Sequence, residues 1–168
     1  MYNVGTTVIY KNEGVCKITE ITERRFRDKN IEYYVLKPVH KDDSEIYVPK
    51  NNKELLGKMR KILSKEEILE LIKTMPDEES IWIADENERK EHYREILIRG
   101  DRTELVRLIK TLYLHKQNQK KTGKKLHIAD EKFLKDAEHL LYDEFAFVFN
   151  ISKDEVLPFI TGELEKSK

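Results

Sequence analysis

The most concentrated chemistry in the sequence is a run of cations between residues 106 and 129. This stretch carries seven lysines and arginines and no aspartate or glutamate. Sequence-independent binding to a phosphate backbone requires an uncompensated positive patch of this kind. The alternative is a solvated helix end, because cations are favoured near a helix C-terminus. Four lysines of the run form a predicted basic loop and are candidate DNA contacts: Lys120, Lys121, Lys124 and Lys125.

A second candidate is Trp82, the only tryptophan, which stands between Ile81 and Ile83 just before a predicted helix. Its large apolar ring with one polar N–H suits either a core anchor or a partner contact. In DNA-binding proteins an exposed apolar residue can also insert as a wedge at a base step. The sequence leaves both interpretations open.

The third candidate group lies in the N-terminal part. Arg24, Arg25 and Arg27 are near a predicted hairpin tip, and Glu45 and Tyr47 are on the last predicted strand. A small sheet with an exposed edge can bind a protein by strand addition, and arginine and tyrosine are frequent in energetically important protein contacts. The alternative is that these residues are ordinary surface groups.

Catalytic and cofactor signatures are missing from the sequence. We find no Gly-x-Ser-x-Gly elbow, glycine-rich phosphate loop, His-Glu-x-x-His or dinucleotide fingerprint. Cys16, the only cysteine, alternates within a predicted strand and is interpreted as a small buried residue. The five histidines lack zinc-ligand spacing. We therefore expect no enzyme, no catalytic residue, no metal, no cofactor and no small-molecule substrate.

Two kinds of element position these candidates. Up to about residue 50 the pattern has period two and predicts four or five short strands, typical of a small bent sheet of SH3 or Tudor size. The predicted strands are 6–10, 15–21, 31–38 and 44–49, with a hairpin tip at 28–30.

From Asn52 onward the hydrophobic period is helical. Ser64 to Glu67 has the form of a capping box, and Gly100 is placed to end a helix. The predicted helices cover 65–75, 86–99, the segment from 101, 129–149 and a last one from 152. In the third of them a core-facing stripe is expected from Leu105, Leu108, Ile109, Leu112 and Tyr113.

The predicted fold class is α+β, a small N-terminal Tudor/SH3-like β domain followed by an all-α helical bundle. We expect these domains at 1–52 and 65–163, a linker or first helix at 53–64 and a tail at 164–168. No apolar run approaches membrane-spanning length and no secretory leader is visible, so we expect a cytoplasmic protein without membrane association.

The overall charge needs division into segments. The 168 residues include 32 Lys and Arg and 32 Asp and Glu, for a formal net charge of zero. This zero is a cancellation, because the basic run lies between acidic stretches at 65–105 and 130–168. Zero net charge therefore does not argue against nucleic-acid binding.

The order of several motifs resembles the CarD/CdnL family of transcriptional regulators, whose first module is shared with transcription-repair coupling factors. The resemblance covers about residues 1 to 160. It is carried by the segments 2–10, 13–18, 32–36 and 46–49, and by Arg99-Gly100-Asp101 leading into 105–112.

The resemblance implies a non-catalytic Tudor-like domain that binds the β subunit of bacterial RNA polymerase. It also implies a helical domain that contacts promoter DNA at the upstream edge of the transcription bubble. By position, the polymerase-contacting arginines of the family correspond to Arg24 or Arg25 and to Tyr47. Tyr47 departs from the pattern because a tyrosine cannot form an ion pair.

Family members often place a wedge tryptophan one short helix before the Gly-Asp step. An ungapped match puts Glu86 there, and Trp82 stands about one helical turn earlier. We carry the wedge role over to Trp82. Because the nearby acids repel phosphate, the DNA face is expected to depend on Arg89, Lys90, Arg94 and the basic loop.

The sequence thus predicts a monomeric transcription regulator that binds the polymerase β subunit and stabilises the open complex through promoter DNA contacts. Its predicted polymerase contacts are Arg24, Arg25, Arg27, Glu45 and Tyr47. The alternative is a protein-only adaptor that tethers a second protein to RNA polymerase.

Overall fold

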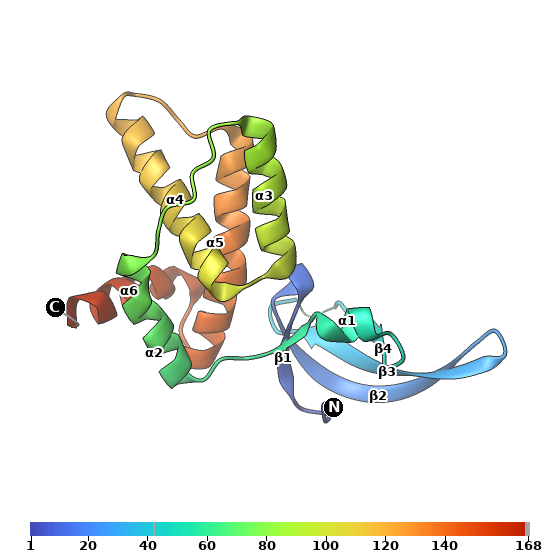
Figure 1. Ribbon diagram of the computed structural model, residues 1–168. Coiled ribbons are helices and arrows are strands. Elements are labelled where there is room, and N and C mark those ends of the chain that lie inside the picture. Colours follow the sequence, from blue (N-terminus) through green and yellow to red (C-terminus); the bar gives the residue numbers. More distant parts are fainter. Residues whose placement is uncertain (42, 167–168) are drawn as a thin grey trace. The chain divides into compact units, whose positions relative to one another are not determined.

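The computed structural model describes residues 1–41 and 43–166. They form two compact units, Met1–Ile62 and Leu63–Lys168. The strands belong to the first unit and the long helices to the second, which confirms the predicted α+β class (Figure 1). We call them the sheet unit and the helical unit.

The sheet unit is built on five antiparallel strands in the spatial order β4-β3-β2-β1-β5. Its buried core includes Val8, Cys16, Ile18, Leu36 and Val48, which confirms the interpretation of Cys16. The elements are β1 (Thr7–Tyr10), a 3-10 turn η1 (Lys11–Glu13), β2 (Val15–Phe26), β3 (Lys29–Pro38), β4 (Ile46–Pro49), α1 (Lys53–Gly57) and β5 (Met59–Lys61).

β5 was not predicted from the sequence. Its three residues show no alternation, and the strand forms because β1 pairs with it, with Ile9 opposite Arg60. It lies in the segment 53–64, which we expected to be a linker or first helix. The sheet unit therefore continues past residue 52 to Ile62.

β2 and β3 form a long hairpin that extends away from the rest of the sheet unit (Figure 1). The two strands stay paired as far as Phe26 opposite Lys29. The turn falls at Arg27 and Asp28, slightly before the predicted 28–30, and Arg27 adopts a left-handed φ of 54°. The outer half of the hairpin is exposed, so its side chains are available to a partner.

The helical unit agrees closely with the predicted helices. Ser64 and Glu67 form the predicted capping box at the start of α2, and Gly100 ends α3 with a left-handed φ of 65°. The elements are α2 (Lys65–Thr74), a 3-10 turn η2 (Met75–Asp77), α3 (Glu86–Arg99), α4 (Arg102–Lys121), α5 (Ile128–Phe149) and α6 (Lys153–Lys166).

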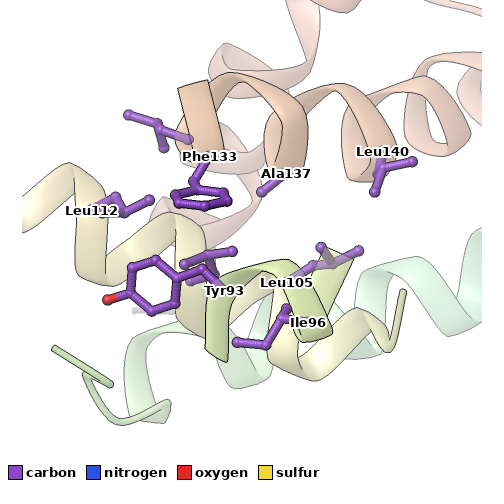
Figure 2. Packing of buried hydrophobic residues seen from close by; sticks show 9 residues of the cluster. Tyr93, Ile96, Leu105, Leu112, Phe133, Ala137 and Leu140 are labelled. Atoms are coloured by element: carbon purple, nitrogen blue, oxygen red, sulfur yellow. The ribbon is translucent and has the colours of Figure 1, made fainter. Parts of the chain in front are cut away.

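The core between α3, α4 and α5 is made of interlocking apolar side chains. Tyr93 and Phe133 meet edge to face with ring centroids 5.8 Å apart, and Ile96, Leu105 and Ala137 surround them (Figure 2). This packing fixes α3 and α4, which carry candidate DNA residues, against α5.

Three details of the helical unit differ from expectation. Lys120 and Lys121, which were expected in the basic loop, lie in the last turn of α4. Tyr113 was assigned to the core stripe of its helix, but 48% of its surface is exposed, because it lies at the edge of the stripe. The expected tail at 164–168 begins inside α6, which runs to Lys166; residues 167 and 168 lie outside the described residues.

Within residues 1–41 and 43–166, no helix combines the length and the apolar character needed to span a membrane.

Candidate functional site

The predicted polymerase contacts in the sheet unit include a connected trio. Arg24 on β2 donates from Nη2 to the Tyr47 hydroxyl at 2.9 Å, and its guanidinium carbon lies 4.2 Å from the centre of the Tyr47 ring. The Tyr47 hydroxyl in turn donates to Glu45 at 3.0 Å. We call Arg24, Glu45 and Tyr47 the arginine–tyrosine cluster.

The sheet register explains this cluster. β3 lies between β2 and β4, with Ile31 opposite Arg24 and Val35 opposite Tyr47. Residues directly opposite each other share a face, as do residues two apart along β3. The Arg24 side chain therefore reaches across β3 to Tyr47.

Tyr47 is well suited to hold an arginine. Its pKa is raised above the ordinary value, mainly by the hydrogen bond that it donates to Glu45. The ring therefore stays neutral at physiological pH, and its hydroxyl accepts from Arg24 while donating to Glu45. A tyrosine at this position supplies no charge, but it holds the charged guanidinium of Arg24 in place.

The hairpin tip carries a residue that the sequence interpretation missed. Phe26 is 59% exposed, and the guanidinium of Arg27 lies 5.6 Å from the centre of its ring. Arg25 donates from Nε to the Arg27 backbone carbonyl at 3.3 Å. The position of Phe26 beside a predicted turn could have indicated its exposure, because that part of a hairpin lies beyond the core.

In the helical unit, Trp82 belongs to an extended segment that runs along α4 between η2 and α3 (Figure 1). The backbone N–H of Ile81 donates to Thr111 at 2.9 Å, and the Tyr93 hydroxyl donates to the Ile81 carbonyl at 3.2 Å. Burial raises the pKa of Tyr93 to about 12, so its hydroxyl keeps the donated proton. These bonds fix the backbone next to Trp82.

The Trp82 ring is itself held in place. It stacks on His115 of α4 with ring centroids 3.7 Å apart, and the Arg89 guanidinium lies 4.4 Å from its centre. Even so, 37% of Trp82 remains exposed. Trp82 is thus anchored on one part of its surface and available to a partner on another.

His115 is a neutral support for this ring. Burial lowers its pKa below the ordinary value of 6.5. The side-chain nitrogen of Gln119 lies 3.1 Å from His115 Nε2, and an amide nitrogen can only donate, so Nε2 accepts and carries no proton.

Arg89 occupies a different place from the one predicted. Its side chain is only 3% exposed, and it donates two hydrogen bonds of 3.0 Å to the carboxylate of Asp130 on α5. Its Nη1 donates to the carbonyl of Ile83 at 3.0 Å. A buried and paired guanidinium does not offer its charge to a phosphate, so Arg89 is a positioning residue for the Trp82 segment and not a DNA contact.

The other two cations predicted on α3 lie at its surface. Lys90 forms an ion pair of 3.0 Å with Glu86, and this hydrogen-bonded partner lowers the pKa of Glu86. Arg94 is exposed. Asp85 uses its carboxylate to cap α3 by accepting from the Glu88 backbone, so part of the acidity near Trp82 is already compensated.

The basic run divides into structural and exposed cations. Arg107 donates to Glu78 at 2.7 Å, Lys110 donates to the carbonyls of Pro76 and Glu78 at 2.8 Å, and Lys116 pairs with Glu131. The remaining cations are the four predicted DNA contacts, and all are exposed. In the part of the chain that the structure describes, none of these four forms an ion pair: Lys120, Lys121, Lys124 and Lys125.

Most of the helical candidates lie toward one end of the unit, whereas Arg94 lies in the second half of α3. The start of α3 lies beside the start of α5, and α4 ends toward the same end of the unit (Figure 1). The Arg89–Asp130 ion pair joins α3 to α5. This end combines an anchored, partly exposed indole with uncompensated positive charge. No group of three or more His, Cys, Asp or Glu side chains among the described residues is arranged to hold a metal ion.

Two family descriptions match the chain. Residues 2–63 match the CarD-like/TRCF RID domain, and residues 67–161 match the CarD C-terminal domain. The chain belongs to the CarD family. A comparison with curated proteins finds no matching relative.

Membership in the CarD family confirms the resemblance inferred from the sequence motifs. It identifies the five-stranded sheet unit as the Tudor-like domain of the family, including α1 and β5, and the helical unit as its C-terminal partner. CarD-family proteins are non-enzymatic transcription regulators that interact with RNA polymerase, so the protein acts in transcription through such an interaction.

Proposed function

We propose that this CarD-family protein binds the β subunit of RNA polymerase through its sheet unit and stabilises the promoter open complex through its helical unit. In this role it is a cytoplasmic monomer without catalytic activity or cofactor. Its DNA contacts lie near the upstream edge of the bubble. Contacts made only to the open state shift the equilibrium toward that state by their differential free energy.

The arginine–tyrosine cluster supports the polymerase half of the proposal. A guanidinium held by a ring and a hydroxyl loses less conformational freedom on binding than a mobile one. With Arg25, Arg27 and the exposed Phe26 on the same hairpin, the surface has the arginine and aromatic composition of a protein interface.

We expect the Arg24→Glu variant to lose at least about tenfold in affinity for the isolated polymerase β subunit, because a carboxylate replaces the held cation. Tyr47→Phe keeps the ring under Arg24 but removes both hydrogen bonds of the hydroxyl, so its loss should be smaller. Pull-down and titration with the full-length chain measure both effects.

The matched control is Lys37→Glu, the same charge reversal at an exposed position of β3 outside the cluster. Equal binding by Arg24→Glu and the unaltered protein would reject the assignment of this surface to polymerase.

The end of the helical unit that carries both Trp82 and the exposed lysines best supports the DNA-binding part of the proposal. Four uncompensated lysines supply sequence-independent attraction to phosphates, and Trp82 supplies an apolar surface for an unstacked base step. The acidic remainder of the chain keeps free DNA binding weak. The polymerase tether then raises the local concentration of DNA at this end.

We expect the combined change of Lys120, Lys121, Lys124 and Lys125 to glutamine to flatten the salt dependence of DNA binding. Each lost phosphate contact lowers the slope of log K against log salt by about one, so the maximum decrease is about four. Fluorescence anisotropy with a short duplex measures the slope. Lys65→Gln with Lys73→Gln on α2 is the control, and an unchanged slope in the loop variant would contradict the DNA assignment.

One observation favours the protein-only adaptor as a second candidate. An apolar groove of about 360 Å³ lies between η2, α4, α5 and α6, and Tyr113 and Leu157 in its lining are about half exposed. A photo-crosslinker in place of Lys121 discriminates between the candidates. A crosslink to promoter DNA in the polymerase complex rejects the adaptor, whereas polymerase binding without such a crosslink supports it.

A further inference from the structure

A groove lies between the last turns of α4 and the first turns of α5, and its α5 wall carries two further exposed lysines, Lys132 and Lys135. The groove has a volume of about 710 Å³. Its lining includes six lysines, two from α4, two from the loop that follows it and two from α5: Lys116, Lys120, Lys124, Lys125, Lys132 and Lys135.

The charged side chains that line this groove are mostly positive. Two carboxylates, Glu131 and Asp136, also line it, and Glu131 is occupied by an ion pair of 2.9 Å with Lys116. Lys132 and Lys135 are exposed. An open groove with this excess of lysine fits a polyanion better than a single small anion, because its charges are spread over two helices and a loop.

An apolar residue lies within the same lining. Ile128, the first residue of α5, is 90% exposed, and the half-buried Leu126 lies beside it in the groove. A single exposed isoleucine needs no explanation by itself. Here, however, Ile128, Lys132 and Lys135 follow the spacing i, i+4, i+7, which puts them on one face of α5.

We propose that this groove is a second DNA contact, in which Lys132 and Lys135 extend the basic loop along one phosphate backbone and Ile128 packs against sugars and base edges in the minor groove. Minor-groove proteins combine cations with apolar residues such as isoleucine in this way. The inference rests on the proposed function and adds three contact residues to it. Because Ile128 has no hydrogen-bonding group, the contact discriminates little between sequences.

The experiment measures affinity of the full-length chain for a short fluorescent DNA duplex over a range of salt concentrations. Lys132→Gln with Lys135→Gln should lower the slope of log K against log salt by about two. Ile128→Ala should leave the slope unchanged and weaken binding by about threefold to tenfold at every salt concentration, because only apolar contact is lost.

Two matched controls separate these effects from general ones. Ile98→Ala removes an isoleucine that is 66% exposed on α3, and Lys65→Gln with Lys73→Gln removes two exposed lysines on α2. All substituted side chains are exposed, so unchanged thermal midpoints should accompany the binding results.

The outcomes distinguish the groove from the function on which it rests. If the unaltered protein neither binds DNA nor prolongs open complexes, the proposed function fails. If it does both and the α5 variants behave like their controls, the groove proposal alone is overturned. Loss of polymerase binding by the α5 variants with unchanged DNA binding would also overturn it, and would show that the groove takes an acidic protein segment.

Discussion

We expect the Arg89→Leu variant to lose about 3–5 kcal/mol of the free energy of unfolding of the helical unit. The substitution leaves the carboxylate of Asp130, which is 1% exposed, buried without its partner. It also removes the hydrogen bond to the Ile83 carbonyl, which fixes the segment behind Trp82. Urea unfolding followed by the fluorescence of Trp82 measures the loss in the helical unit.

Removing both charges should cost less than removing one. The Arg89→Leu, Asp130→Leu double variant leaves no unpaired buried charge, so part of the stability should return. Lys90→Leu, one position along α3 and paired only near the surface, is the control. An Arg89→Leu variant that stays as stable as the parent but loses DNA affinity would show that Arg89 is a phosphate contact after all.

The second large effect is expected from Trp82→Ala, which should shorten the lifetime of the promoter open complex by about tenfold or more while leaving polymerase β binding intact. The lost ring is the only anchored and partly exposed indole at the lysine-bearing end of the described helical unit. Decay of competitor-resistant open complexes measures the lifetime.

Tyr113→Ala is a suitable control because Tyr113 is an aromatic residue of α4 with a comparable exposed fraction, 48% against 37% for Trp82. Trp82→Phe should fall between alanine and the parent, since a smaller ring covers less of a base step. A full lifetime in the Trp82→Ala protein would limit Trp82 to an anchoring role.

Together the Arg89→Leu and Trp82→Ala variants distinguish the residue that positions the Trp82 segment from the residue proposed to contact DNA. Arg89 acts through the position of the 82–84 segment, so its loss should affect stability first and the open complex second. Trp82 is the proposed contacting group, so its loss should affect the open complex first. The reverse order of effects would exchange the two roles.

The helices could be predicted from the sequence because their ends are encoded locally. Asp85 and Gly100 cap α3 by contacts within one turn, and Ser64 and Glu67 do the same for α2. The family resemblance could also be predicted, because it depends on the order of motifs along the chain. The number of strands could be predicted only as four or five, because β5 forms through its pairing with β1.

The candidate site was less predictable because its decisive contacts join distant segments. The burial of Arg89 depends on Asp130, 41 residues away, and nothing in the local pattern distinguishes Arg89 from an exposed cation such as Arg94. Likewise, the contact between Arg24 and Tyr47 crosses an intervening strand. Sequence spacing gives the residue types of both surfaces but not which charges are already neutralised.

The stacking of Trp82 on His115 places the tryptophan fluorophore directly against a titratable side chain. The lowered pKa of His115 favours the neutral imidazole against the indole. Because the chain has one tryptophan, its tryptophan emission reports on the surroundings of Trp82 alone. Under the proposed function, contact of the indole with DNA should therefore change this emission, and the change can be followed without any attached dye.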